Sequence, residues 1–295
     1  MPSPADSLPV TANYEQLDLR YDRHHEALWY RLKPANRPCF NRTLLKELRR
    51  FQMDVTRVNA EALAAGEPLP VRYTVLASGL PGVFNLGGDL ALFSELIRGG
   101  DRQRLLEYAT ACIDVLYPNA VGFDQPVTTI SLVQGDALAG GFEAAISSHV
   151  VIAERQARFG LPEVLFNLIP GMGAYTFLSR RVSPEVAEGL ILSGDMVCAE
   201  RMHELGLVDM VVDPGRGEEG LAHYLAQHHK RCNAHAALRQ VRQAVNPITY
   251  EELIAVTTIW VDAALQLRDR DLRVISRIVA AQDRSLRREA RQATA

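Results

Sequence analysis

The chain has 295 residues, of which 47% are hydrophobic, a composition typical of a soluble globular protein with a sizeable core. Its formal net charge of -3 argues against a nucleic-acid-binding protein. No apolar run approaches the roughly 20 residues needed to cross a bilayer, so we expect no membrane protein.

The cellular compartment is indicated by the N-terminus and the cysteines. Residues 1–6 contain neither a basic stretch nor an apolar core, so we expect no secretory signal. The cysteines are scattered without a C-x-x-C pair, which is typical of a reducing cytoplasm and argues against a disulfide framework or a zinc site. They are Cys39, Cys112, Cys198 and Cys232. We therefore expect a cytoplasmic protein without a metal.

Strand and helix patterns alternate along the first 213 residues. Residues 1–20 are polar and contain prolines, which predicts a flexible N-terminal lead-in. A strand is predicted at 27–32, and apolar residues at three- and four-residue steps from Leu44 to Val58 indicate an amphipathic helix that ends at 66–70. A polar insert is expected at 57–70. Further strands are predicted at 73–77, 127–133, 150–153 and 208–212, and helices at about 90–116, at 140–148, after 173 and at 183–194.

The remainder of the chain is predicted to be helical. From Gly220 onward the pattern is interrupted only at Asn246-Pro247, and Thr249 and Glu252 have capping-box spacing. An α/β core over residues 21–215, followed by a C-terminal helical region over 216–295, is therefore expected.

Two glycine-containing segments are predicted to connect a strand to a helix. They are residues 84–89, F-N-L-G-G-D, and residues 139–143, A-G-G-F-E. N–H groups at the start of a helix have no intrahelical partner, and glycine lets a ligand approach them closely. Two such groups that converge on one point would form an oxyanion hole. Either segment alone is also typical of an ordinary tight turn.

Two glutamates lie near these glycines, in apolar surroundings. Glu143 follows Gly140-Gly141, and Glu163 ends the segment F-G-L-P-E, twenty residues later. Burial penalises a charged carboxylate and raises its pKa, so two such groups facing one substrate could exchange protons near neutral pH. Each glutamate alone is also typical of a helix end.

The segment from 73 to 212 resembles the crotonase (enoyl-CoA hydratase/isomerase) superfamily. The matching stretches are F-N-L-G-G-D-L (84–90), Q-P-V-T-T-I-S-L-V-Q-G-D-A-L-A-G-G-F-E (125–143), V-V-I-A-E (150–154), F-G-L-P-E-V (159–164), I-P-G-M-G-A (169–174) and G-L-V-D-M-V-V (206–212). The resemblance implies a spiral of ββα units with a helical C-terminal region, assembled as a trimer or hexamer. Two features depart from the family pattern. His149 stands where the family usually has an Asp, and it is interpreted as a hydrogen-bonded structural residue. The polar insert at 57–70 puts the usual mode of CoA binding in doubt.

Carried over by position, the resemblance places the oxyanion donors at the N–H groups of Gly88 and Gly140 and the acid/base carboxylates at Glu143 and Glu163. It implies addition or elimination of water at C2–C3 of an acyl thioester, with acyl carrier protein or CoA as the carrier and no cofactor. By the family's division, Glu163 takes the C2 proton and Glu143 donates to the departing hydroxyl; the sequence leaves the reverse open.

A finer resemblance is to the diffusible-signal-factor synthases, carried by N-R-P-C-F-N (36–41), G-D-A-L-A-G-G-F-E-A-A (135–145) and the run from 159 to 175. It implies dehydration of a 3-hydroxyacyl chain, hydrolysis of the thioester, and a free cis-2-unsaturated fatty acid as a quorum-sensing signal. The resemblance also makes a membrane sensor kinase a candidate partner. Alternatives are an enoyl-CoA hydratase or isomerase, and a protein of this fold that mainly binds a signalling partner.

The acyl tail requires an apolar slot, for which Met172 and Trp260 are the candidate lining residues. Both are equally typical of core packing. His223, His228 and His229 lie on one predicted helix, and we interpret them as solvated residues because no Cys, Asp or Glu ligands accompany them.

Overall fold

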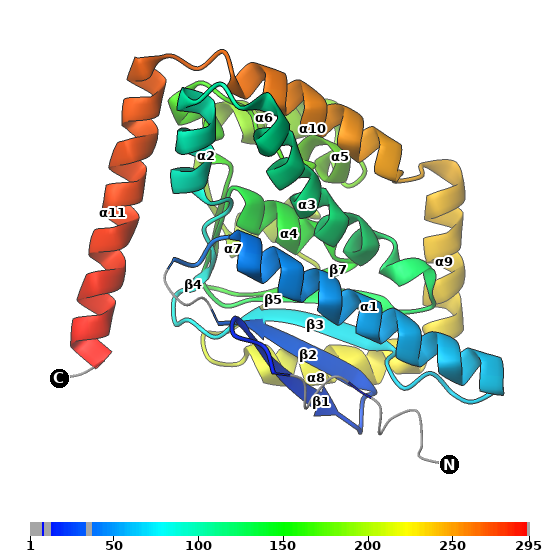
Figure 1. The fold of residues 1–295 in the computed structure, drawn as a ribbon. Helices are drawn as coiled ribbons and strands as arrows, with labels where there is room; N and C mark the ends of the chain where they lie inside the picture. Colours follow the sequence, from blue (N-terminus) through cyan, green and yellow to red (C-terminus); the bar gives the residue numbers. More distant parts are fainter. Residues whose placement is uncertain (1–7, 9–12, 34–36, 294–295) are drawn as a thin grey trace.

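A computed structural model describes residues 8, 13–33 and 37–293, and the statements below refer to these residues. Its larger sheet has the strand order β1-β2-β3-β5-β7-β10 (Figure 1). These strands are β1 (Leu17–Asp22), β2 (Ala27–Leu32), β3 (Tyr73–Ser78), β5 (Thr128–Val133), β7 (Val150–Glu154) and β10 (Met210–Val212). The β1–β2 pair is antiparallel and all other neighbours are parallel.

A smaller sheet has the order β4-β6-β8-β9. Its strands are β4 (Val83–Asn85), β6 (Asp136–Leu138), β8 (Arg158–Gly160) and β9 (Met196–Cys198). The first three are parallel to one another and follow β3, β5 and β7 along the chain. The chain therefore runs three times from the large sheet to the small sheet and then into a helix, which is the repeated ββα unit that the sequence resemblance implied.

Helices cover both faces of the large sheet (Figure 1). Alternate residues of β2 point to opposite sides: Leu28 and Tyr30 join the core under α1 and α3, whereas Ala27 and Trp29 join the cluster under α8. The helices are α1 (Arg42–Ala65), α2 (Leu90–Arg98), α3 (Arg102–Ala120), α4 (Gly140–Ser147), α5 (Ala174–Leu178), α6 (Pro184–Ser193), α7 (Ala199–Glu204), α8 (Gly217–His229), α9 (Cys232–Val245), α10 (Tyr250–Ala264) and α11 (Asp269–Ala293), with short 3₁₀ helices η3 (Gly122–Asp124) and η4 (Pro162–Phe166).

The expected insert at 57–70 is mostly helical, which corrects the prediction. Val58 and Ala62 continue the buried stripe of α1, so the helix extends to Ala65. Gly66 ends it in the left-handed conformation, with φ of 71°, and its N–H caps the last carbonyls. Most of the expected insert therefore belongs to the first helix, which ends within the expected segment 66–70.

The N-terminal region contains a strand that the sequence pattern did not indicate. β1 begins at Leu17, inside the lead-in expected over residues 1–20, and pairs with β2. Of that lead-in, residues 1–7 and 9–12 lie outside the described residues. The short strands β4, β6, β8 and β9 were also not predicted, because three residues are too few to show a periodicity.

Two histidine interpretations have different outcomes. His149 is confirmed as a structural residue: its Nδ1 accepts from the Thr129 N–H at 3.1 Å, and burial lowers its pKa to about 3. His228 is not solvated, which corrects that prediction. It is 4% exposed and its Nδ1 lies 2.9 Å from the Tyr73 hydroxyl, because it extends the face of α8 that packs on the sheet through Leu221 and Leu225.

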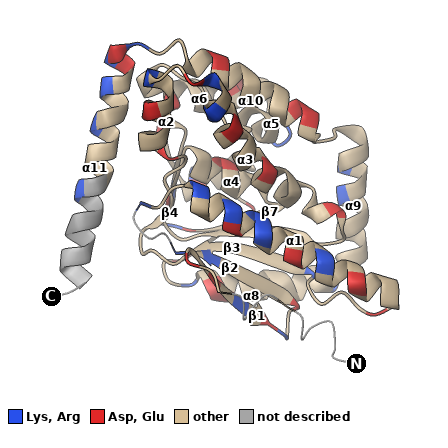
Figure 2. Ribbon diagram, viewed as in Figure 1, with Lys and Arg blue, Asp and Glu red and all other residues tan. Residues whose placement is uncertain are grey.

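The C-terminal helices α10 and α11 pack against α2, α3 and η4 through a separate apolar cluster that includes Phe93, Val261 and Ile275. Charged residues of both signs are interspersed over the outer surfaces (Figure 2). Among the described helices, none is both long enough and apolar enough to cross a membrane. The same part of the chain contains no group of three or more His, Cys, Asp or Glu residues that could hold a metal ion.

Candidate active site

The three ββα units bring their strand-to-helix junctions to one edge of the small sheet, because the carboxyl ends of parallel strands meet at the same edge. Gly87-Gly88 follows β4, Ala139-Gly140 follows β6, and Glu163 follows β8. Residues that are far apart in the sequence are therefore neighbours here. This edge contains the predicted oxyanion glycines and both predicted carboxylates.

The first glycine turn is held by hydrogen bonds from within and from the segment before α1. The Asn85 side chain accepts from the Gly87 N–H at 2.7 Å, and the Gly87 carbonyl accepts from the Phe40 N–H at 2.8 Å. Because the 87–88 peptide is trans, the N–H of Gly88 points opposite to this carbonyl and therefore away from Phe40. The Asp89 side chain then caps α2 by accepting from the N–H groups of Ala91 and Leu92.

The second glycine turn carries backbone strain. Ala139, which precedes α4, has φ of 51° and ψ of -130°, a conformation that usually costs a non-glycine residue about 1 to 3 kcal/mol. Its N–H donates to the Gly160 carbonyl at 2.8 Å, which anchors the turn to β8. Gly140 then begins α4, so its N–H has no intrahelical acceptor.

The two glycine turns are in direct contact. A Cβ added to Gly87 would lie 2.6 Å from the Ala139 Cβ and 2.9 Å from the Gly140 nitrogen, closer than packing allows. Within the described residues, neither the Gly88 N–H nor the Gly140 N–H donates to a protein acceptor. Two unpaired donors thus lie on adjoining backbone segments, as the oxyanion prediction requires; their role in binding a thioester carbonyl remains a prediction.

Glu143 lies in the first turn of α4 and is 1% exposed. Its Oε1 accepts from the N–H groups of Met172 and Ala174 at 2.7 and 2.9 Å. Burial raises the pKa of this carboxyl to about 7, and the two hydrogen bonds oppose the shift because they favour the ionised form. Near neutral pH, Glu143 is therefore poised between its two protonation states.

Glu163 lies on η4 and is 6% exposed. Its Oε2 is buried and has no hydrogen-bond partner among the described residues. Burial raises the pKa of Glu163 well above its usual value, and the charge of Glu143 raises it further. The two carboxyl groups consequently share one site, with the proton held preferentially by Glu163.

The two candidate tail-pocket residues lie close to this centre. The Met172 sulfur would be overlapped by a Cβ on Gly140, so this side chain covers the second glycine turn. The Trp260 ring packs on the backbone of Gly171, 2.5 Å from where a Cβ would lie, and stacks on Phe93 at a centroid distance of 5.2 Å. The structure thus places Met172 beside Glu143 and Trp260 against Gly171. Their contact with an acyl tail stays a prediction.

Some residues that support the site carried no signal in the sequence. Tyr108 on α3 bonds to the first glycine turn, and Cys112, one helical turn later, is close enough to Glu143 for its pKa to be affected by that charge. Both belong to an apolar helix stripe that indicates only core packing. Asn85 could have been recognised, because Asn two residues before a glycine is typical of a turn closed by its side chain.

Comparison with known proteins identifies the family. Residues 60–271 match the family model described as enoyl-CoA hydratase/isomerase. The peroxisomal fatty acid beta-oxidation multifunctional protein AIM1 of Arabidopsis thaliana is 33% identical over 141 residues, which cover 48% of this chain and 19% of that protein. The glyoxysomal multifunctional protein MFP-a of Brassica napus is 34% identical over 140 residues, with the same coverage. The match thus spans about a fifth of the length of these relatives.

Solved structures share the fold. An enoyl-CoA hydratase from Bacillus halodurans superposes with a TM-score of 0.74 at 19% identity, covering 89% of this chain and 99% of that one. DspI from Pseudomonas aeruginosa superposes with a TM-score of 0.67 at 24% identity, covering 80% and 91%. Together with the family match, the paired glycine turns and the carboxylates, these comparisons show that the chain belongs to the enoyl-CoA hydratase/isomerase family, within the crotonase superfamily.

Proposed function

We propose that this protein removes water from a 3-hydroxyacyl thioester and then hydrolyses the thioester, releasing a cis-2-unsaturated fatty acid of the diffusible-signal-factor type. The proposal is carried by one observation: two buried carboxyl groups share a site beside two unpaired glycine N–H groups. The resemblance of the glycine and glutamate motifs to the diffusible-signal-factor synthases supports this reading over that of a simple hydratase.

In the first step, the thioester carbonyl accepts from the N–H groups of Gly88 and Gly140, which stabilises the enolate charge. Elimination starts from the less populated arrangement, in which Glu143 carries the proton and Glu163 is ionised. Glu163 takes the proton from C2, and Glu143 gives its proton to the departing C3 hydroxyl. The C3–O bond breaks and water leaves. The step ends with the proton on Glu163 and the charge on Glu143, which is the distribution that burial and hydrogen bonding favour in the resting protein.

The second step uses this end state. Glu143 is now a carboxylate next to the newly formed water, and it removes a proton as that water attacks the thioester carbon. The same glycine N–H groups hold the tetrahedral oxyanion. When the C–S bond breaks, protonated Glu163 supplies the proton that the departing thiolate needs. The net reaction converts a 3-hydroxyacyl thioester into a 2-enoic acid and a thiol, with no net consumption of water.

The carrier and assembly belong to this proposal as well. The acyl group is carried by acyl carrier protein or CoA, and the protein acts as a homo-oligomer, a trimer or hexamer. Exposed apolar residues on one stripe of α9 support a subunit contact: Leu238, Val241 and Val245 are 50, 55 and 79% exposed.

An enoyl-CoA hydratase or isomerase is the second candidate, and two observations favour it. The family model matches residues 60–271, and a proton on Glu163 opposite ionised Glu143 is also the state from which hydration would start. The two candidates differ in whether the thioester survives.

The experiment is to supply purified protein with 3-hydroxyacyl thioesters of acyl carrier protein and of CoA, and to identify products by mass spectrometry. We expect free cis-2-enoic acid and free thiol from the wild-type protein. Glu143→Gln and Glu163→Gln should each lower the rate by about 100- to 10,000-fold, with circular dichroism unchanged. A trans-2-enoyl thioester without free acid would identify a hydratase, and full activity in either variant would refute the assigned roles.

A further inference from the structure

The Tyr108 hydroxyl occupies an unusual place in the backbone pairing beside Gly88. Phe40 and Gly88 form an isolated parallel bridge. In such a bridge, the N–H and C=O of one residue pair with the residues on either side of its partner. The Phe40 N–H donates directly to the Gly87 carbonyl at 2.8 Å. On the other side, however, the Asp89 N–H donates to the Tyr108 hydroxyl at 2.7 Å, and that hydroxyl donates to the Phe40 carbonyl at 2.7 Å.

The hydroxyl therefore acts as a spacer in the bridge. It keeps the Gly88–Asp89 peptide farther from Phe40 than a direct hydrogen bond would, while the Gly87 side remains directly bonded. The two peptides that flank Gly88 are thus fixed separately. The Gly88 N–H belongs to the directly bonded 87–88 peptide, which is joined to the Tyr108-bonded 88–89 peptide only through the two backbone dihedral angles of Gly88. Its direction therefore depends on both attachments.

The buried environment of Tyr108 keeps its hydroxyl protonated, so that it remains a donor. The residue is 5% exposed, and burial raises the pKa of the phenol well above its usual value, so the proton donated to Phe40 is always present. A Cβ added to Gly88 would lie 3.2 Å from the hydroxyl oxygen, which places this oxygen directly under the glycine.

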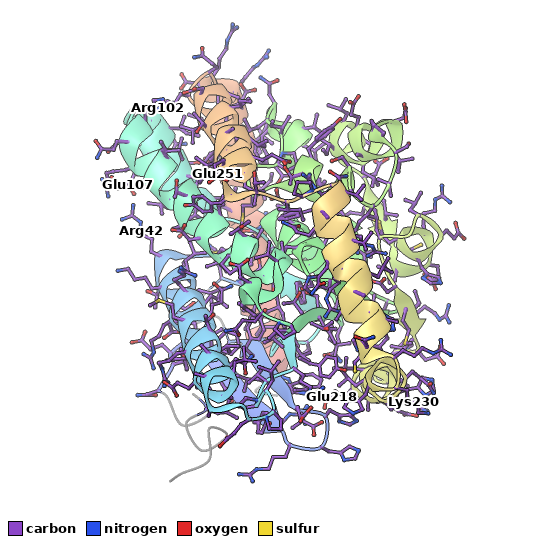
Figure 3. All side chains as sticks on the ribbon, turned by 90° about the vertical axis from the view of Figure 1, so that its right-hand side faces the viewer. Arg42, Arg102, Glu107, Glu218, Lys230 and Glu251 are labelled. Carbon is purple, nitrogen blue, oxygen red and sulfur yellow. The ribbon has the colours of Figure 1, made fainter. Side chains whose placement is uncertain are left out.

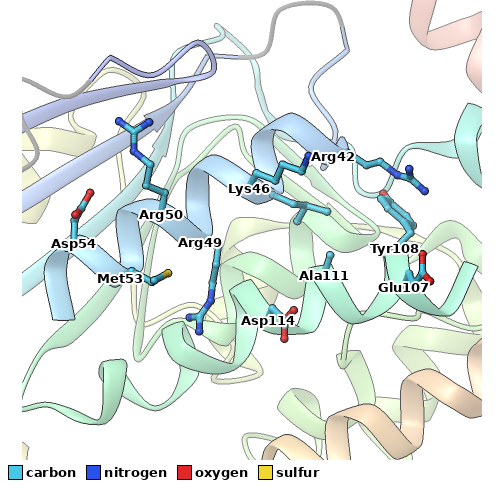
Figure 4. Close-up of a pocket in the computed structure, with 11 residues that line it drawn as sticks. Arg42, Lys46, Arg49, Arg50, Met53, Asp54, Glu107, Tyr108, Ala111 and Asp114 are labelled. Atoms are coloured by element: carbon cyan, nitrogen blue, oxygen red, sulfur yellow. The ribbon is translucent and has the colours of Figure 1, made fainter. Parts of the chain in front are cut away.

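Tyr108 is held from α3, which packs beside α1, with Glu107 of α3 and Arg42 of α1 near their adjoining ends (Figure 3). Its side chain lines one end of a groove of about 580 Å³ between these helices, and its hydroxyl points towards the start of α1 (Figure 4). Cys112, on the same helix, lies near Glu143. Helix α3 therefore adjoins both the first glycine turn and the carboxyl group of Glu143.

We infer that Tyr108 is a positioning residue whose hydroxyl sets the direction of the Gly88 N–H, and through it the polarisation of the substrate carbonyl. The inference rests on the proposed use of Gly88 as an oxyanion donor. Without the hydroxyl, either the Asp89 N–H and the Phe40 carbonyl remain unpaired, or they close into a direct bond. In both cases the Gly88 peptide rotates, and the direction of its N–H relative to that of Gly140 changes.

The test uses Tyr108→Phe in the full-length protein, with Tyr250→Phe as the matched control. Tyr250 also loses one hydroxyl that bonds to α3, since it donates to Asp114 at 2.8 Å, but it is not part of the glycine turn. The first readout is the absorption maximum of bound 4-dimethylaminocinnamoyl-CoA, which moves to longer wavelength when its carbonyl oxygen accepts hydrogen bonds. The second is kcat and KM for the 3-hydroxyacyl thioester.

We expect Tyr108→Phe to lose most of the wavelength shift and to lower kcat about 10- to 100-fold, less than the roughly 100- to 1000-fold loss of a whole donor, with KM changed less than threefold. Tyr250→Phe should change neither quantity. A wild-type wavelength shift in Tyr108→Phe, or a loss confined to KM, would overturn the inference.

The test also gives an answer if the Tyr108→Phe variant does not fold or if the wild-type protein releases no enoic acid. If Tyr108→Phe does not fold, Tyr108→Met supplies an adaptable apolar side chain without the hydroxyl, and the same loss of wavelength shift is expected. If the wild-type protein shifts the probe but does not release enoic acid, the proposed reaction fails while the role of Tyr108 is still decided, because the wavelength shift requires only a polarised carbonyl.

Discussion

The carboxyl group of Glu143 lies close enough to that of Glu163 for the charge of the first to raise the pKa of the second. Glu143 accepts two backbone N–H groups, whereas Glu163 Oε2 accepts none from the described residues. The hydrogen bonds stabilise the ionised form of Glu143, whereas the ionised form of Glu163 has no such support at Oε2. Glu163 therefore holds its proton more strongly than Glu143, whose pKa lies near neutral pH.

The first prediction concerns the titration of this pair. Carbon-13 NMR of labelled glutamate carboxyls should show Glu143 ionising near pH 7 in the wild-type protein. Glu163→Gln should leave that value within about one unit, because a neutral amide replaces a group that is already neutral. A large fall in the Glu143 pKa in this variant would mean that Glu163 carries the charge instead.

The second prediction is that the free energy of unfolding of Glu163→Gln increases relative to that of the wild type as the pH rises. The folded pKa of Glu163 is raised, so above the unfolded value of 4.5 the unfolded chain releases a proton that the folded chain retains. Wild-type stability therefore falls with rising pH, by up to about 1.4 kcal/mol per unit from this one group. Urea unfolding at pH 5 and pH 8 measures the difference, and an advantage that does not grow between them contradicts the prediction.

Glu154 provides a control of opposite sign. Burial alone raises the pKa of Glu154, but hydrogen bonds from the Gly215 N–H, two glutamine side chains and the Gly217 N–H outweigh it and hold the pKa below its usual value. Its contribution to stability is present above the unfolded pKa and lost as the pH falls through the folded one. Glu154→Gln should therefore be less stable than wild type at pH 7, with the deficit shrinking in acid.

The third prediction tests the contact between the glycine turns. Gly87 has φ of 97°, and an added Cβ would meet Ala139 and the Gly140 nitrogen. Gly87→Ala should cost about 1 to 3 kcal/mol of stability and abolish activity, because backbone atoms must separate. Gly189, exposed within α6 and free of neighbours within 4 Å, is the matched site. Gly189→Ala should instead stabilise by about 0.5 to 1 kcal/mol with normal activity, as measured by thermal unfolding and product formation.

The fourth prediction concerns chain-length preference. Trp260 stacks on Phe93 beside Gly171, next to Met172, so replacing it with Ala opens space near the carboxylates. We expect Trp260→Ala to shift the preferred acyl chain to greater length, measured as kcat/KM across a series of 3-hydroxyacyl thioesters. Trp260→Phe retains the stacking surface and should keep the wild-type preference. An unchanged preference in Trp260→Ala would remove this residue from the tail pocket and leave it as core packing.

The sequence identified the long elements well, because each carries its own apolar period. The strand at 27–32 was predicted with the bounds of β2, and the helix that begins before Leu44 was correct in type. This helix ends at Gly66, within the segment 66–70 that was expected to end it, although the polar residues after Val58 gave its last turns the pattern of an insert. The three-residue strands of the small sheet were missed, since their stability comes from neighbours remote in the sequence rather than from local pattern.

The sequence by itself determined the candidates: the residue types indicated the two glycine segments and the glutamates Glu143 and Glu163, because glycine permits close backbone approach and carboxylates move protons, and the family resemblance placed the donors at Gly88 and Gly140. Tertiary structure alone decided how they act together. It brought three parallel strand ends to one edge, inserted the Tyr108 hydroxyl beneath Gly88, and supplied Glu143 with two N–H donors while leaving Glu163 without. Hydrogen-bond direction and burial depend on atoms from distant segments, so no local pattern of residues contains them.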